Sequence, residues 1–151
     1  MMDYRQLCAQ LESLAEEDRH YVPLLSNASA LIFQAMEDLN WAGFYLMRGD
    51  RLTLGPFQGK VACIHIPLGK GVCGTAAKAD ATQRVPDVHA FPGHIACDGA
   101  SRSEIVVPLR QNGAVIGVLD IDSPLPDRFS AEDQAGLEAF ARTLEALVKL
   151  D

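Results

Sequence analysis

The chain has 151 residues, of which 48% are apolar, and a single domain of this size buries roughly 68–70% of the surface that its unfolded form exposes. Twenty acidic residues against thirteen basic ones give a formal charge of −7, and the lysines and arginines are scattered rather than gathered into a stripe. This charge repels nucleic-acid phosphates and anionic lipid, so a small molecule or a protein is the expected partner.

The N-terminal segment, MMDYRQLCAQLESLAEEDRH, carries charges every few residues and has no apolar core followed by a small-residue cleavage site, so no signal peptide is evident. No run approaches the roughly 18 apolar residues that a membrane-spanning helix needs. We therefore expect a cytoplasmic protein without membrane association. In that compartment, cysteines are normally reduced thiols.

The first forty residues carry the periodicity of helices. Apolar residues recur at helical spacing from Tyr4 to Leu14, and again over a longer stretch from Leu24 to Leu39. This pattern predicts two amphipathic helices.

From Trp41 onward the pattern changes to short β-type runs, WAGFYLMR, LTLGPFQG and VACIHIPL, with a Gly-Asp turn after the first. Antiparallel hairpins fit this spacing best. A short Ala-rich helix is predicted from Thr75 to Lys78. The next run, RVPDV, indicates a short strand that Pro86 places toward an edge of the sheet.

A loop of about a dozen residues, His89 to Ser101, follows and contains a cysteine; loops of this length are often functional. Two strong strands come next, EIVVPLR and AVIGVLDID, and they should pair through a turn in which Gly113 supplies the positive φ. Ser130 and Asp133 form a capping-box-like start for a final amphipathic helix.

The order of elements is helices, then mostly antiparallel strands, then a closing helix. This order predicts a single α+β domain over residues 1–151, with the N- and C-terminal helices packed on one face of the sheet. The other face is then free to form a pocket.

Three cysteines, Cys63, Cys73 and Cys97, fall within 35 residues, whereas Cys8 lies on the apolar side of the first helix and is interpreted as a small buried hydrophobe. The segments GKGVCGT and HIACDGASRSE surround two of the thiols with glycine and polar residues, so we expect exposure and flexibility there. An accessible thiol with a second thiol within reach is what redox chemistry requires. The nearby His89, His94 and Arg102 are candidates for lowering the pKa of Cys97. These residues predict a thiol reductase that cycles through a disulfide. The alternative is that they are three ordinary buried or surface thiols with no partner.

Three carboxylates extend the candidate site. Side chains alternate along a strand, so Asp120 and Asp122 project to the same side, and Glu104 opens the neighbouring strand. Like charges at close quarters raise one another's pKa, which a bound amino group or a role in protonating a leaving oxygen would explain. The alternative is that the strand emerges into solvent there. Trp41 is expected in the core or as an aromatic wall of a pocket.

Two other interpretations use the same region. A zinc site built from these cysteines with His65, His89 and His94 lacks close ligand pairs such as C-x2-C, because the cysteines are ten and twenty-four residues apart. The segment GKGVCG spells G-x-G-x-x-G but lacks the strand and crossover helix that give this motif its meaning. We interpret its glycines as permitting a mobile or tightly turned loop that carries Cys73.

The segments WAGFYL, GPFQGKVACIHIPLGKGVCGTAA, VPDVHAFPGHIACDGASRSEIVVPL and GVLDIDSP closely resemble the free methionine-(R)-sulfoxide reductases, a branch of the GAF domain family. The resemblance extends from about Leu31 to Leu147. A generic GAF domain shares the GVLDID-type strand and the closing helix, whereas the three cysteines distinguish the reductase branch. The resemblance implies a GAF fold and reduction of free, rather than protein-bound, L-methionine (R)-S-oxide to L-methionine.

The resemblance also implies roles for individual residues. Cys97 is the nucleophile that attacks the sulfoxide sulfur, and Cys73 and Cys63 resolve and relay the disulfide to thioredoxin, in an order left open. No metal and no cofactor is expected, and a homodimer is left open. The residues implied to hold the substrate, protonate its oxygen or line the pocket are Trp41, Tyr45, Glu104, Asp120 and Asp122.

The alternative from another class is a non-catalytic GAF module that binds a small ligand and signals by association. Sensor modules are usually attached to an output domain, and the 151 residues contain no such segment, which favours the enzyme. A metal-binding protein is the third hypothesis, which elemental analysis would test.

Overall fold

The computed structural model describes residues 2–95 and 97–151. Its strands form one six-stranded antiparallel sheet in the order β3-β2-β1-β6-β5-β4, so that β1 and β6 lie at the centre. In chain order the elements are α1 (Tyr4–Glu17), α2 (Tyr21–Ala35), β1 (Trp41–Arg48), β2 (Arg51–Gly59), β3 (His65–Pro67), α3 (Gly71–Ala79), β4 (Gln83–Val85), a 3-10 turn η1 (Val88–Ala90), β5 (Ser103–Gln111), β6 (Ala114–Ser123) and α4 (Ala131–Leu147).

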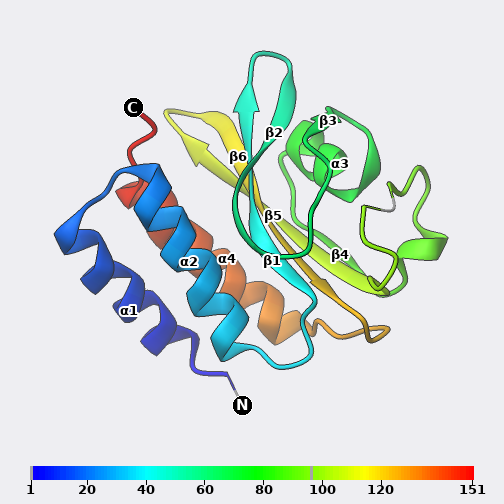
Figure 1. Cartoon of the computed structure of the whole chain (residues 1–151), viewed down its shortest axis with the longest axis horizontal. Coiled ribbons are helices and arrows are strands. Elements are labelled where there is room, and N and C mark those ends of the chain that lie inside the picture. The colour runs from blue at the N-terminus through cyan, green and yellow to red at the C-terminus, as the bar shows by residue number, and fades with distance from the viewer. Residues whose placement is uncertain (1, 96) are drawn as a thin grey trace.

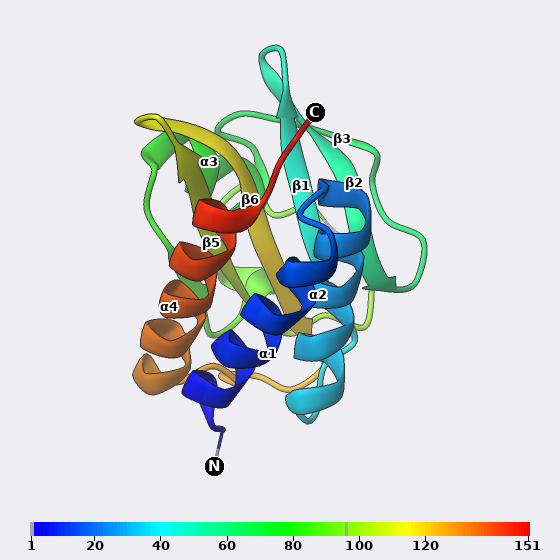
Figure 2. The ribbon, with the colours of Figure 1, turned by 90° about the vertical axis from the view of Figure 1, so that its left-hand side faces the viewer.

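The helices divide between the two faces of the sheet. Figure 1 shows α1, α2 and α4 on one face and α3, with its adjoining loops, on the other; Figure 2 looks onto the three-helix face. The predicted α+β architecture is therefore confirmed, with the N- and C-terminal helices together on one side. No helix in the described ranges combines the length and apolar character needed to cross a bilayer.

Alternation along the central strands separates a core from a pocket. On the helix side, β1, β5 and β6 contribute fully buried apolar residues, and burial of each side chain larger than alanine is worth about 1.5–3 kcal/mol. These inward residues are Ala42, Phe44, Ile105, Val107, Leu119 and Ile121. The other face carries a second cluster that α3 covers, and it is there that polar side chains gather.

Local signals in the C-terminal half are confirmed. The Ser130 hydroxyl accepts a hydrogen bond from the Asp133 backbone N–H at 3.0 Å, and the Asp133 carboxylate accepts one from the Ser130 N–H, also at 3.0 Å. This reciprocal pair is the predicted capping box. In the turn between β5 and β6, Asn112 and Gly113 both have positive φ, 54° and 78°. The short strand β4 lies at the sheet edge and ends before Pro86, as the ring of that proline requires.

Two expectations in the middle of the chain are wrong. The run VACIHIPL forms a strand only at His65–Pro67, and the residues before it form a loop. Helix α3 begins at Gly71, four residues before the predicted start, so Cys73 lies in its first turn and is buried at 5% exposure instead of sitting on a mobile loop. The glycine pattern misled because Gly69 and Gly71, with φ of 81° and 62°, shape the tight entry to a helix.

Candidate active site

The sheet register brings three carboxylates together on the face opposite the three-helix layer. Glu104 on β5 pairs directly with Asp122 on β6, and Asp120 lies two residues earlier on β6, on the same face. Glu104 and Asp120 are 7% and 5% exposed, and all three residues line one pocket. The predicted clustering is confirmed, and the alternative that the strand simply emerges into solvent is wrong.

Burial raises the pKa of each of these carboxyls. Desolvation, reinforced by the neighbouring Asp120, places the pKa of Glu104 and of Asp122 well above their usual range. Desolvation also raises the pKa of Asp120, but hydrogen bonds from Glu104, Cys73 and Asp122 oppose that rise. Asp120 is therefore the carboxyl that ionises most readily, and the other two retain protons that they can donate.

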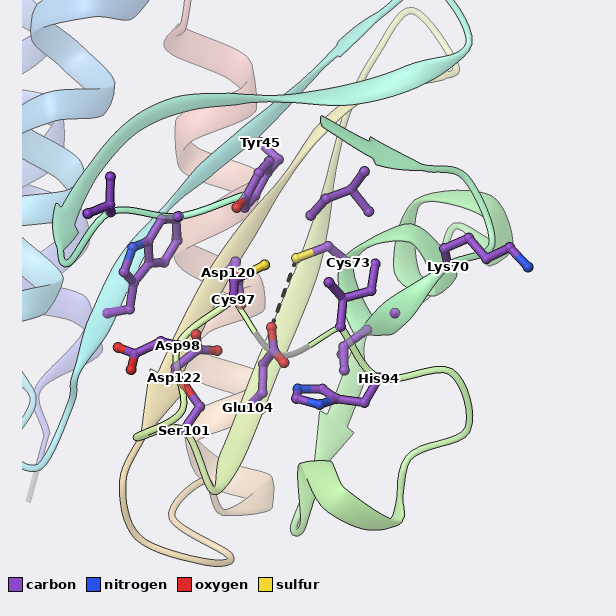
Figure 3. Close-up of a pocket in the computed structure, with 17 residues that line it drawn as sticks. Tyr45, Lys70, Cys73, His94, Cys97, Asp98, Ser101, Glu104, Asp120 and Asp122 are labelled. Atoms are coloured by element: carbon purple, nitrogen blue, oxygen red, sulfur yellow. Dashed lines mark hydrogen bonds between the residues drawn. The ribbon is translucent and has the colours of Figure 1, made fainter. Parts of the chain in front are cut away.

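The acid cluster has open hydrogen-bonding capacity. Two of its oxygens, Asp120 Oδ1 and Asp122 Oδ1, are buried and have no hydrogen-bond partner among the described residues. The basic side chains that line the pocket in the described ranges are Lys70 and His94. Lys70 extends away from the acids (Figure 3), and partial burial lowers the pKa of His94, favouring its neutral form. The pocket therefore suits a ligand that brings its own cation.

Two aromatic residues of β1 form a wall of the pocket. Trp41 and Tyr45 are each 2% exposed and stack with ring centroids 5.9 Å apart. They also hold the segment that precedes β3, because Trp41 Nε1 donates to the Lys60 carbonyl at 3.1 Å and the Tyr45 hydroxyl donates to the Cys63 carbonyl at 2.9 Å. The aromatic wall thus fixes the backbone that carries one of the cysteines.

Cys63 and Cys97 are joined in a disulfide, with Cα atoms 5.6 Å apart. Both residues are half-buried, and of the two only Cys97 lines the pocket. The sequence left the disulfide partner of Cys97 open between Cys63 and Cys73, and the structure contains the pairing with Cys63. Cys8, a free thiol on α1, is half-buried against the helix-side core, on the opposite side of the sheet from the pocket.

Cys73 is a free thiol beneath the pocket. Its Sγ lies 3.9 Å from Glu104 Oε2, the contact drawn as a dashed line in Figure 3. Desolvation, reinforced by the charges of Asp120 and the other acids, raises its pKa well above the ordinary value, so this sulfur stays a thiol. Because the thiolate is the nucleophilic form of cysteine, a thiol held neutral is a poor nucleophile.

The loop that carries Cys97 is fastened by residues that the sequence did not identify. Asn40, just before β1, donates through Nδ2 to Asp98 Oδ2 and to Ser101 Oγ, both at 3.0 Å. Asp98 Oδ1 accepts the Ala100 backbone N–H at 2.9 Å, and the bonds from Ala100 and Asn40 hold the Asp98 pKa below its usual range. The sequence signals only one side of this contact, because the Asp-x-x-Ser run from Asp98 to Ser101 suggests a structured turn beside the cysteine. It does not identify Asn40.

Of the three basic residues expected near Cys97, the structure places only His94 in the lining of the pocket. His94 lines the pocket, and His89 lies edge-on to it with ring centroids 6.4 Å apart. Arg102 is exposed. His94 is thus the one of the three that the fold places within the site.

Metal ligation was the rival interpretation of the cysteines. The disulfide occupies the sulfurs of Cys63 and Cys97, so neither is a thiolate ligand in this state. Within the described residues, the atoms close enough to share an ion come from Cys73, Glu104 and Asp120, within 4.8 Å of one another. That set differs from the cysteine and histidine set that the sequence suggested.

Known proteins match this chain over most of its length. The profile of the GAF domain family matches residues 25–149. Free methionine-R-sulfoxide reductase of Escherichia coli is 50% identical over 145 residues, 96% of this chain and 88% of that protein. The protein of the same name from Saccharomyces cerevisiae is 50% identical over 147 residues, 92% of this chain and 82% of that protein.

Solved structures give the same result. The structure of fRMsr of Staphylococcus aureus in complex with its substrate superposes with a TM-score of 0.92 at 50% identity, covering 99% of this chain and 97% of that one. The reduced form of the same protein superposes with a TM-score of 0.94, with the same coverage.

Proposed function

The chain belongs to the free methionine-R-sulfoxide reductases within the GAF domain family, and from that premise we propose that it reduces free L-methionine (R)-S-oxide to L-methionine. One observation carries the proposal: Cys97, bonded to Cys63, opens onto a pocket that the carboxyls of Glu104, Asp120 and Asp122 also line. An oxidisable sulfur and a set of proton donors thus meet in one cavity.

Cys97 is the nucleophile in this proposal. Its thiolate attacks the sulfoxide sulfur, the sulfoxide oxygen takes a proton and transfers to Cys97 as a sulfenic acid, and methionine leaves with two electrons. Cys63 then attacks the sulfenic sulfur and releases the oxygen as water, which leaves the Cys63–Cys97 disulfide. Thioredoxin returns two electrons and restores both thiols. The pairing in the structure supports Cys63 as the resolving residue.

The pocket supplies charge and protons. Asp120, whose carboxyl ionises most readily, binds the ammonium group of the amino acid. Glu104 and Asp122 keep their protons because burial and the neighbouring charge raise their pKa, so they protonate the sulfoxide oxygen. Cys73, a neutral thiol in contact with Glu104, supports that proton donor instead of forming the first disulfide.

The aromatic wall completes substrate binding. Trp41 and Tyr45 line the pocket beside the acids, since Trp41 pairs directly with Asp122 across β1 and β6, and they exclude water from the reacting sulfur. A disulfide that is made and broken in each cycle needs a reducing compartment, which supports a cytoplasmic location.

The test is an assay of the reduced protein with the separate R and S sulfoxides of free methionine. We expect selective consumption of the R epimer and no turnover by Cys97→Ser. Cys8→Ser is the matched control, because Cys8 lies across the sheet from the pocket. Binding of an epimer without turnover would instead favour the sensor alternative, and equal consumption of both epimers would overturn the proposed specificity.

A further inference from the structure

Three exposed apolar side chains lie within two residues of Cys63 or Cys97 in the chain, and two of them, Val61 and Ile95, also line the pocket. Val61 and Ile64 are 89% and 62% exposed, the two highest values among the large apolar residues exposed in the described ranges. Ile95, which is 37% exposed, stands two residues before Cys97. Single exposed apolar residues are ordinary, but three of them beside the two cysteines of one reactive bond indicate an interaction surface.

The backbone beneath this group, which we call the Val61–Ile64–Ile95 surface, is fixed by hydrogen bonds and packing. The Ile64 carbonyl accepts the Leu54 backbone N–H at 2.8 Å. The Ile95 side chain lies over Gly71, where an added Cβ would come within 3.2 Å of it. The disulfide then ties the two segments together, with the Cα atoms of Cys63 and Cys97 5.6 Å apart. The surface is therefore ordered before any partner arrives, which lowers the entropic cost of binding.

The two sulfurs of the disulfide face different surroundings. Cys97 lines the substrate pocket, whereas Cys63 is absent from its lining and has exposed Ile64 as its chain neighbour. A small substrate therefore reaches the sulfur of Cys97 from within the pocket. A partner too large for the pocket meets the Cys63 side of the bond.

Charge adds to the recognition. Exposed Lys60 precedes Val61, and exposed Lys70 lies on another side of the pocket and points outward (Figure 3). The chain as a whole has a formal charge of −7, and these two lysines place positive charge near the disulfide, although Asp98, which lines the same pocket, interacts with Lys60. A partner with an apolar centre and acidic side chains around it would complement the surface.

We propose that the Val61–Ile64–Ile95 surface is the docking site for the protein dithiol that regenerates the enzyme, and that this reductant attacks Sγ of Cys63. The inference rests on the proposed function and identifies how its reductant binds. The reductant's thiolate forms a mixed disulfide with Cys63 while the Cys63–Cys97 bond breaks, and the bonding electron pair leaves on Cys97 as its thiolate. The reductant's second thiol then loses its proton and displaces Cys63, which leaves as a thiol.

Docking is tested by comparing a protein reductant with a small dithiol. In Ile64→Ser, the KM for thioredoxin should rise roughly tenfold, since an apolar anchor at an interface commonly contributes more than a fivefold effect. Turnover driven by dithiothreitol should be unchanged, because Ile64 does not line the substrate pocket. Leu125→Ser, which removes another exposed apolar side chain at 43% exposure, is the matched control and should leave both values unchanged.

The outcomes separate docking from the reaction itself. An unaltered thioredoxin KM in Ile64→Ser, with normal dithiothreitol turnover, would overturn the docking site. Loss of dithiothreitol-driven turnover in the unmodified protein would instead contradict the proposed function.

The attacked sulfur is tested by trapping. A thioredoxin variant that lacks its second active-site cysteine should stop at the mixed disulfide, and peptide mass spectrometry should find the link at Cys63. A link at Cys97 would overturn the assignment of Cys63 as the attacked sulfur.

Discussion

Asn40 and Asp98 lie 58 residues apart in the chain and are joined by a hydrogen bond of 3.0 Å from the amide Nδ2 to the carboxylate Oδ2. The bond fastens the residue before β1 to the residue after Cys97. The same amide nitrogen donates to Ser101, so one side chain fixes two positions of the loop that carries the proposed nucleophile. We therefore predict that Asn40 acts on Cys97 as a positioning residue.

Replacing Asn40 with alanine should loosen this loop. Each lost hydrogen bond is worth about 1 kcal/mol, and the freed Asp98 carboxylate becomes a less ordered neighbour of Cys97. We expect kcat to fall by about tenfold, since misplacement of a reacting group raises the barrier, with a small change in KM. Steady-state kinetics with dithiothreitol measure this, and Asn27→Ala, on the exposed surface of α2, is the control. If Asn40→Ala kept the wild-type kcat, the contact would contribute to the structure of the loop but not to catalysis.

Replacing Cys63 and replacing Cys73 should have different effects, because only Cys63 is proposed as the resolving residue. In Cys63→Ser, the reaction should stop with Cys97 as a sulfenic acid, because the thiol that forms the disulfide with Cys97 has been removed. One equivalent of methionine should then form per protein, with one added oxygen detected by mass spectrometry, and multiple turnover should be lost. Cys73→Ser should still form the Cys63–Cys97 disulfide. A Cys73–Cys97 disulfide formed at the wild-type rate in Cys63→Ser would identify Cys73 as an equally competent resolving residue.

The sequence predicts features that depend on local alternation, but it does not predict contacts between distant residues. The pocket carboxyls follow from the period of two in AVIGVLDID, which places Asp120 and Asp122 on one face whatever the rest of the fold does. The partner of Cys97 does not follow from any local rule, because it depends on how Trp41 and Tyr45 hold the Cys63 segment.

Cys73 shows why local composition misled. A glycine-rich stretch is compatible with an open loop and with the tight entry to a packed helix, and only the docking of α3 on the sheet distinguishes them. The Asn40 contact was missed for a similar reason, since its two partners are separated from it by 58 and 61 residues.

The raised pKa of Glu104 predicts how stability depends on pH. Burial and the charges of Asp120 and Asp122 raise this pKa in the folded chain, so the folded state binds the proton more tightly than the unfolded state. The stabilisation is complete below the unfolded pKa of about 4.3 and is lost as pH rises from there toward the folded value. Glu104→Gln removes this dependence. The melting temperature of Glu104→Gln should therefore rise relative to that of the wild type as the pH increases from 5 to 8.

Thermal unfolding at several pH values measures this difference. Glu132→Gln, which changes an exposed acid in the first turn of α4, should show no such pH-dependent gain. Glu104→Gln should also lower kcat, since an amide cannot deliver the proton to the sulfoxide oxygen. A melting-temperature difference that is constant across this pH range would contradict the assigned pKa direction.

The hydroxyl of Tyr45 should control the disulfide-forming step. It donates to the Cys63 carbonyl at 2.9 Å, and this bond holds the backbone of Cys63 where its sulfur can reach Cys97. Tyr45→Phe keeps the ring that stacks on Trp41 but removes the donor, so methionine formation in the first turnover should be little changed while closure of the disulfide slows. Rapid quenching with a thiol-alkylating reagent separates the two steps. Tyr21→Phe, on α2 across the sheet, is the control, and equal closure rates in Tyr45→Phe and the wild type would show that Cys63 is placed by the backbone alone.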